Sequence, residues 1–184
     1  MKKLIKILAI LIIYIEFITP SFAQEKSDVF PIIAVSNEAK VKLKTMRTIA
    51  ILLRGNNSLL TRIIEDALAI YLTNEGFTII NRELLEKSIG KLVAKKKKER
   101  SEGAINALDI GIAVNADSIL TGTIVIEFGE QSSLLIKVAS FQLLDVASGK
   151  VLINVLFESE KGKSFSEIAK RFVKILEGFT RDNC

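Results

Sequence analysis

The chain has 184 residues, of which 49% are hydrophobic and 26% charged, and its formal net charge is +5. This length and balance predict one globular domain rather than a disordered or fibrous chain. The sequence has no His, no Trp and a single Cys. It therefore lacks a Ser-His or Cys-His pair, an imidazole metal ligand and an internal disulfide, which excludes most common hydrolase and metalloenzyme mechanisms.

Residues 1–23 have the three-part layout of a cleaved secretory signal peptide. Three lysines precede a mostly apolar run over residues 7–18, and Thr-Pro-Ser-Phe-Ala follows. We expect cleavage before Gln24. An uncleaved anchor is the alternative, but the run is shorter than the roughly 20 residues that a spanning helix needs, and it contains Glu16. The sequence thus predicts export to the periplasm, with no Cys after the run to carry a lipid.

Residues 24–47 are expected to form an amino-terminal arm or an edge strand. Residues 29–35 look extended, and Pro31 cannot donate to a sheet ladder, which argues against a central position. Residues 40–44 alternate with period two, which also favours an extended segment. The main domain is then expected over residues 48–184.

A strand-helix-strand unit is predicted over residues 48–80. Residues 48–53 form a short apolar run, typical of a buried strand, and Asn57 or Ser58 can cap the helix that follows. Gly76 ends this helix, and residues 77–80 return as a strand. The unit predicts parallel pairing with a right-handed crossover. The apolar helix positions recur at spacings of three and four, and they are Leu60, Ile63, Ile64, Ala67, Leu68 and Tyr71.

Two further helices are predicted next. Asn81 can cap the first, which runs into the basic segment Lys95–Lys98 with Arg100, and the second begins near Ala104. The expected buried positions of the first are Leu84, Leu85, Ile89 and Leu92. Those of the second are Ile105, Leu108, Ile112 and Ala113.

Three strands and a closing helix complete the chain. The strands are expected near residues 118–127, 134–144 and 151–158, and the turn Asp145–Lys150 predicts an antiparallel hairpin. Ser164 and Glu167 have capping-box spacing for a helix to about Glu177. Its apolar stripe is Phe165, Ile168, Phe172, Ile175 and Leu176. The predicted fold class is α/β (α+β), with a mixed sheet of about five strands and helices packed against it.

Short motifs give little sign of catalysis. Ser88-Ile89-Gly90-Lys91 matches the Ser-x-x-Lys pattern of penicillin-binding enzymes, but no SDN or KTG motif accompanies it. The pair Gly149-Lys150 lacks the upstream glycine of a phosphate loop. We therefore predict no catalytic, cofactor-binding or metal site, and a protein that is not an enzyme.

The remaining charged and reactive groups have structural explanations. The carboxylates have the spacings of helix faces and caps, and they are Glu65, Asp66, Glu83, Glu86 and Asp117. Lys95–Lys98 has no aromatic neighbours for base stacking, so a solvated helix face is preferred to nucleic-acid binding. Attraction to an anionic membrane or cell-wall polymer stays open. Cys184 is interpreted as an incidental exposed thiol, able to form intermolecular disulfides after export.

Four sequence pieces, in this order and spacing, resemble the CsgG-like family, which includes the curli secretion protein CsgG, LpoB-type synthase activators and the TolB amino-terminal domain. The resemblance covers about residues 48–160. The first piece is the strand Ile49–Leu52, and the second, Gly76–Arg82, resembles a family strand that ends in an Arg. The third, Ala116–Gly122, resembles the family's Ala-Asp-x-Ile-Leu-x-Gly, and the fourth, Asp145–Lys150, resembles its Asp-x-x-Thr-Gly-Glu/Lys turn.

The motif residues that this resemblance selects are Arg82, Asp117, Gly122, Asp145 and Gly149. Structural roles are preferred for all of them. Arg82 is expected to bind a carboxylate or a carbonyl. Asp117 and Asp145 are expected to accept hydrogen bonds in turns, and the two glycines are expected to relieve backbone crowding.

The resemblance implies a non-catalytic protein that serves as an export-channel subunit or as a docking module for envelope proteins. We expect an exported periplasmic interaction domain in envelope assembly or secretion, which binds envelope proteins or a second copy of itself. The alternative is a subunit of an outer-membrane curli-type export assembly, in which residues 29–46 insert or link neighbours. The chain lacks the aromatic girdles of transmembrane hairpins, which favours the first hypothesis.

Overall fold

The computed structural model describes residues 31–98, 105–128 and 134–180. The expected signal peptide, Arg100 and Cys184 lie outside the described residues. The elements in chain order are β1 (Ile32–Val35), α2 (Ala39–Thr45), β2 (Thr48–Gly55), α3 (Ser58–Asn74), β3 (Thr78–Ile79), α4 (Arg82–Lys98), α5 (Ala107–Ala113), β4 (Ser118–Phe128), β5 (Leu134–Asp145), β6 (Val151–Lys163) and α6 (Phe165–Thr180). Within the described ranges, no helix combines the length and the apolar character needed to cross a membrane.

The strands form one mixed sheet in the order β1-β6-β5-β4-β2-β3. Strand β2 pairs in parallel with β3 and with β4, whereas β4 to β5, β5 to β6 and β6 to β1 are antiparallel. The predicted mixed sheet and the parallel pairing of β2 with β3 are confirmed. The sheet has a sixth strand, β1, which comes from one of the two segments expected to be extended.

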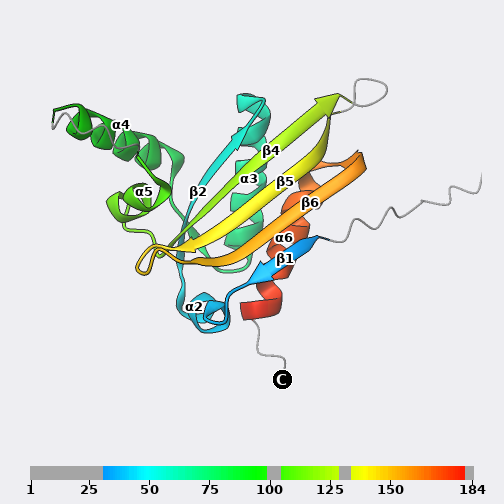
Figure 1. The fold of residues 1–184 in the computed structure, drawn as a ribbon, viewed down its shortest axis with the longest axis horizontal. Coiled ribbons are helices and arrows are strands. Elements are labelled where there is room, and N and C mark those ends of the chain that lie inside the picture. Colours follow the sequence, from blue (N-terminus) through cyan, green and yellow to red (C-terminus); the bar gives the residue numbers. More distant parts are fainter. Residues whose placement is uncertain (1–30, 99–104, 129–133, 181–184) are drawn as a thin grey trace, which may run out of the picture.

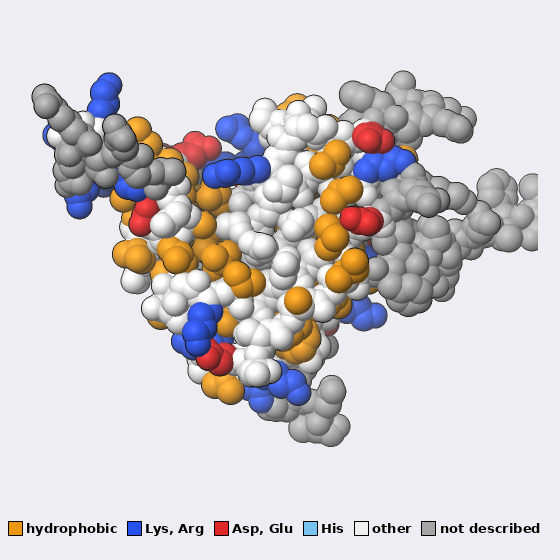
Figure 2. All heavy atoms as spheres, viewed as in Figure 1, with side chains coloured by type: hydrophobic (Ala, Val, Ile, Leu, Met, Phe, Trp, Pro, Cys, Tyr) orange, Lys and Arg blue, Asp and Glu red, His pale blue; other side chains and the backbone are white. Residues whose placement is uncertain are grey.

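Helices pack on both faces of the sheet, but they cover them unequally (Figure 1). Helices α2, α3 and α6 share the larger core with one face of the sheet. Helices α4 and α5 pack on the other face at one end, where a smaller core forms around Leu85, Ile110 and Ile119. No helix of the described residues covers the rest of that second face, which is the face seen in Figure 2.

Strand β2 is buried on both faces, as its continuous apolar run predicts. Ile49, Ile51 and Leu53 belong to the larger core, whereas Ala50 belongs to the smaller one. This alternation follows from the period of two in a strand, because successive side chains point to opposite faces. Helix α3 begins as predicted, with Asn57 accepting a hydrogen bond from the Leu60 backbone N–H at 3.1 Å.

The extended structure expected for residues 40–44 is wrong, because this segment lies in helix α2. Ala39 and Leu43 are four residues apart and both are fully or almost fully buried, whereas Val41 is 70% exposed. In a helix, residues four apart share a face, so Ala39 and Leu43 pack into the core together. Contact with the core thus selects the helical period over the weaker alternation of apolar and basic residues.

Helix α4 confirms its predicted start, since the Asn81 side chain accepts from the Glu83 backbone N–H at 2.7 Å. Leu84 was expected to be buried, but it is exposed, and Ser88 is buried in its place. Helix α5 begins at Ala107 rather than near Ala104. Its start is fixed by a reciprocal capping box between Asn106 and Asp109, which satisfies two backbone amides at once.

The predicted hairpin and closing helix are both confirmed. Strands β5 and β6 pair antiparallel across the Asp145–Lys150 turn. Helix α6 buries Ile168, Phe172 and Leu176 against the sheet, and the Glu167 backbone N–H donates to the Ser164 hydroxyl at 3.3 Å. Phe172 completes an aromatic cluster with Phe141 and Phe157 at the centre of the larger core.

Candidate interaction surface

Asp117 joins the starts of two neighbouring strands. One oxygen of its carboxylate accepts hydrogen bonds from the backbone N–H groups of Arg47 and Thr48, both at 2.8 Å. Its own N–H donates to the Thr48 carbonyl, and its carbonyl accepts from Val146. The residue therefore fixes the register between β2, β4 and the β5–β6 turn, rather than offering a free carboxylate to a ligand.

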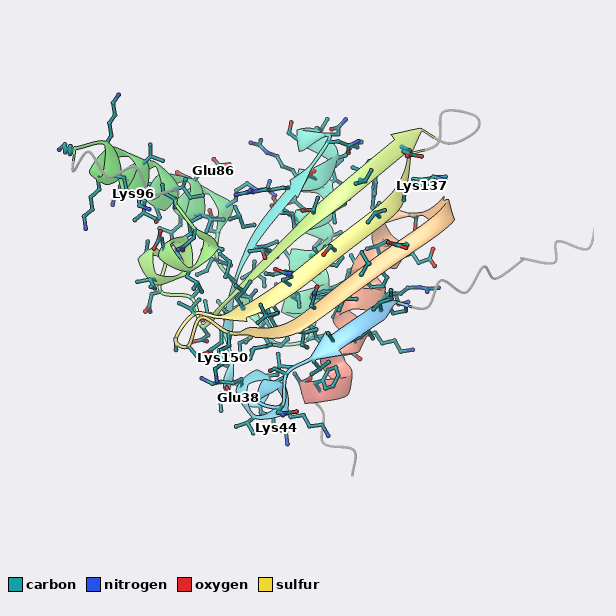
Figure 3. The ribbon with its side chains drawn as sticks, in the orientation of Figure 1. Glu38, Lys44, Glu86, Lys96, Lys137 and Lys150 are labelled. Atoms are coloured by element: carbon teal, nitrogen blue, oxygen red, sulfur yellow. The ribbon has the colours of Figure 1, made fainter. Side chains whose placement is uncertain are left out.

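Asp145 organises the β5–β6 turn and ties it to α2. Its Oδ2 atom accepts the backbone N–H of Ser148 at 2.9 Å, the hydroxyl of the same residue, and the Lys42 ammonium at 3.2 Å. Gly149 follows with a φ of +71°, a conformation that costs little without a Cβ. A second ion pair, Lys150 with Glu38 at 2.6 Å, links the same turn to α2 (Figure 3).

The pKa of Asp145 is lowered by these contacts. Burial raises it, but the hydrogen bonds from Ser148 and the charge and hydrogen bond of Lys42 outweigh burial, so the pKa lies below the ordinary 3.8. A lowered pKa means that the ionised carboxylate stabilises the fold at neutral pH. This contribution is complete above the unfolded pKa and is lost as the pH falls through the folded pKa.

We therefore expect Asp145→Asn to lower the free energy of unfolding by about 1–3 kcal/mol at neutral pH. The difference from the parent should shrink in acid, because the parent carboxylate then becomes protonated. Urea unfolding from neutral pH down to about pH 3 measures both. Asp66→Asn is the control, since its carboxylate is largely exposed. A constant difference across that range would contradict the assigned role of Asp145.

Arg82 lies where the resemblance predicts a contact with a carboxylate. Its guanidinium contacts Glu65 at 3.0 Å and Asp66 at 2.9 Å, both on α3, and it also donates to the Arg62 carbonyl at 3.4 Å. Glu65 uses its other oxygen to accept the Leu53 backbone N–H of β2 at 2.9 Å. Arg82 and Glu65 thus connect α4, α3 and the side of β2.

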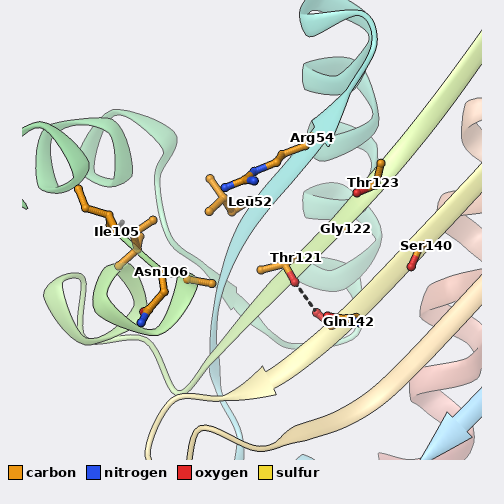
Figure 4. Close-up of a pocket in the computed structure, with 11 residues that line it drawn as sticks. Leu52, Arg54, Ile105, Asn106, Thr121, Gly122, Thr123, Ser140 and Gln142 are labelled. Carbon is orange, nitrogen blue, oxygen red and sulfur yellow. Dashed lines mark hydrogen bonds between the residues drawn. The ribbon is translucent and has the colours of Figure 1, made fainter. Parts of the chain in front are cut away.

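Gly122 lies in the middle of β4, beside a pocket of about 320 Å³ between the open sheet face and α5 (Figure 4). Short polar side chains from β4 and β5 form the floor, including Thr121, Thr123 and Ser140. Leu52 and Ile105 lie on the side toward the helices. Arg54 is the one ionisable group among its lining residues, so the pocket combines a single positive charge with neutral hydrogen-bonding groups.

The two residues of the Ser-x-x-Lys match are not brought together. Ser88 is on the buried side of α4 whereas Lys91 is exposed, so the two side chains of the Ser-x-x-Lys match lie in different environments. Glu86 contacts Arg62 at 3.7 Å. Within the part of the chain that the structure describes, no group of three or more acidic or Cys side chains gathers to hold a metal ion.

One edge of the sheet is closed by side chains. The carbonyls of Arg47, just before β2, and of Ile49 accept hydrogen bonds from the β3 segment, but β3 is only two residues long. Further along the same edge, the Leu53 N–H is taken by the Glu65 carboxylate. Because a neighbouring strand would need this N–H, the carboxylate of Glu65 competes with strand addition at β2.

At the opposite edge, no residue that the structure describes protects β1 in this way. The Ser36 N–H donates to the Leu152 carbonyl of β6 at 2.9 Å. Antiparallel strands alternate their bonding sides, so Ile33 and Val35 direct their N–H and C=O groups away from the sheet. All four residues of β1 are exposed, with Ile33 at 41% and Val35 at 37%. The strand carries no charge. It is a short, apolar and open edge.

In the sequence, Glu65 stands out only as a member of a helix face, and its bond to β2 is seen only in the structure. No pattern in the sequence signals that bond, because the partner is a backbone amide twelve residues away. The edge position of β1 agrees with the sequence, because residues 29–35 look extended and Pro31 argues against a central strand.

No family model matches the sequence, and no curated protein matches it. Several solved structures are similar to this one in the path of the backbone. The PelC dodecamer from Paraburkholderia phytofirmans is 12% identical, with a TM-score of 0.48, over 84% of this chain and 100% of that chain. The LpoB C-terminal domain from Salmonella enterica is 20% identical, with a TM-score of 0.42, over 66% of this chain and 93% of that one.

TolB from Acinetobacter baumannii is 18% identical with a TM-score of 0.43, and the match covers 82% of this chain but 31% of that protein. All three TM-scores are below 0.5, so the activities and partners of these proteins do not transfer to this chain on the similarity alone.

Proposed function

We propose that the protein is an exported, non-enzymatic interaction domain of the periplasm that acts in envelope assembly or secretion. It takes an extended segment of another envelope protein as a seventh strand beside β1. The sequence pieces that resemble the CsgG-like family support the same kind of role. No cofactor or nucleic acid is required.

The open edge of β1 is the observation that carries this proposal. Ile33 and Val35 offer two outward N–H groups and two outward C=O groups in an apolar setting. An added strand would satisfy those groups through main-chain hydrogen bonds, and the exposed side chains of β1 would contact alternate side chains of the partner. The other sheet edge is a poor site for strand addition, because Glu65 occupies the Leu53 N–H.

Photo-crosslinking at Val35 in cell envelopes is the experiment that tests the strand addition. A crosslinker at Val35 is expected to form one dominant adduct, which mass spectrometry identifies. Ile33→Pro should reduce this adduct about tenfold, because it removes an outward N–H without removing a bond to β6. Edge strands accept Pro at such positions, so the fold should persist.

The matched control places the crosslinker at Leu59, an exposed apolar residue of α3. The crosslinker at Leu59 should not form the adduct seen from Val35. Ile33→Pro should not change the nonspecific crosslinking from Leu59. An adduct with a second copy of the chain would identify a homo-oligomer built on β1. Equal adducts at both positions, or an adduct at Val35 that survives Ile33→Pro, would contradict strand addition.

The export-assembly alternative required residues 29–46 to insert into a membrane or to link neighbours. Within residues 31–46, β1 pairs with β6 and α2 contributes Ala39 and Leu43 to the core, so this part is built into the domain. Light scattering after size exclusion, with and without detergent, distinguishes the two proposals. A closed ring that forms only in detergent would favour the export assembly.

A further inference from the structure

Helix α4 carries a basic face that the proposed function does not use. From Lys87 to Lys98 the helix has six lysines and no acidic residue. Lysines spaced four, four and three residues apart lie on one side of a helix. All four members of this set are exposed; they are Lys87, Lys91, Lys95 and Lys98, here called the α4 basic face.

The fully buried residues of α4 all lie near its start, and Leu92 is the last residue of the helix that packs against the smaller core. Leu85 and Ser88 are its buried residues, and both lie within the first two turns. The second half extends past the sheet, with α5 beside it (Figure 1). Lysines near the carboxyl end of a helix also stabilise it by interacting with the helix dipole, but that effect is limited to the last turn. It does not explain Lys87 and Lys91.

An exposed apolar side chain borders this basic face. Ile112 on the adjacent α5 is 67% exposed. Between the two helices a pocket of about 350 Å³ is lined by Leu92 and Ile112 together with lysine stems. Asp109 of α5 reaches one lysine, Lys96, at 3.4 Å. The second half of α4 and the adjacent α5 therefore combine excess positive charge with an exposed apolar side chain.

We infer that the α4 basic face and the neighbouring Ile112 bind the surface of a bilayer that contains anionic phospholipids. The lysines would be attracted to the headgroups, and the Ile112 side chain would enter the interface beside them. The exposed Ile112 side chain favours a bilayer over a purely polar polyanion. Nucleic acid is the weaker partner, because neither α4 nor α5 has an aromatic residue on which a base can stack.

Vesicle sedimentation tests the inference. The test protein is the full chain as purified after export, and the parent and every variant are purified in the same form. Vesicles of roughly three parts phosphatidylcholine to one part phosphatidylglycerol should bind the parent, whereas pure phosphatidylcholine should bind it weakly. Raising the salt concentration should weaken the binding, because the attraction is electrostatic. The triple variant Lys91→Glu/Lys95→Glu/Lys98→Glu should reduce partitioning to the anionic vesicles at least about tenfold.

The matched control is Lys40→Glu/Lys170→Glu/Lys174→Glu, which makes the same charge change at exposed positions on α2 and α6. It should keep most of the binding. A milder set, Gln in place of Lys91, Lys95 and Lys98, keeps helix propensity and should give an intermediate loss, so misfolding cannot account for the result.

Ile112→Ser separates a membrane from a polar polyanion. It should weaken vesicle binding several-fold while leaving all lysines in place. Equal losses in the α4 variant and the control would overturn the inference. So would a parent that ignores the anionic vesicles, or one that binds an oligonucleotide or an acidic peptide more tightly than the vesicles.

Discussion

Phe141→Ala is expected to lower the free energy of unfolding by about 3–5 kcal/mol. Phe141 on β5 is fully buried, and its ring centroid lies 6.0 Å from that of Phe157 on β6 and 4.9 Å from that of Phe172 on α6. Truncation removes both ring contacts and leaves a cavity between the sheet and α6, where neighbouring backbone cannot collapse fully. Urea unfolding monitored by circular dichroism measures the loss.

The control is Phe165→Ala, at a partly buried position at the start of the same helix. It should cost clearly less, because part of that ring is already in water. Equal losses at both positions would contradict the packing described for the aromatic cluster. The cluster also matters for the proposed function, since it holds β5 and β6 on α6, and β1 is attached to the sheet only through β6.

Gly122→Ala should cost about 3 kcal/mol, at the upper end of the range for overpacking. A Cβ at this position would lie 2.2 Å from the Ser140 carbonyl oxygen and 3.0 Å from the Phe141 ring. The first contact is with backbone, so no side-chain rotation relieves it. Gly122 stands opposite Phe141 in the antiparallel pairing of β4 and β5, and its missing side chain leaves room for the ring.

Gly90→Ala is the matched control, because a Cβ there meets nothing within 4 Å on the exposed side of α4. In a helix interior this change should stabilise the protein by about 0.5–1 kcal/mol. The same chemical substitution is thus expected to have opposite signs at the two positions. Urea unfolding of both variants measures it, and a neutral Gly122→Ala would show that β4 and β5 separate more easily than their pairing indicates.

The family-motif residues show how far pattern and geometry agree. Asp145 and Gly149 sit in the turn that their spacing predicts, because turn chemistry is local and involves neighbours in sequence. Asp117 also accepts hydrogen bonds, but its donors belong to Arg47 and Thr48, at the start of a different strand, β2. Arg82 finds its carboxylates on α3. The residue types predict the kind of contact, and the fold chooses the partner.

The sequence by itself determined the elements whose signals are local. Apolar periodicity, the Asn57, Asn81 and Ser164 caps, and the Asp145–Lys150 turn place most helices and strands correctly, because each depends on residues within about one helical turn or hairpin. It also determined the mixed character of the sheet. A strand-helix-strand unit followed by a hairpin leads to one parallel and one antiparallel half.

Only the tertiary structure decided what depends on distant packing. Residues 40–44 have an ambiguous period, and burial of Leu43 in the larger core makes them helical. The capping of β2 by Glu65 and the open edge at β1 follow from the strand order, which places the two ends of the sheet far apart in space. Local sequence cannot encode which backbone amides remain unpaired, because that depends on where every other strand lies.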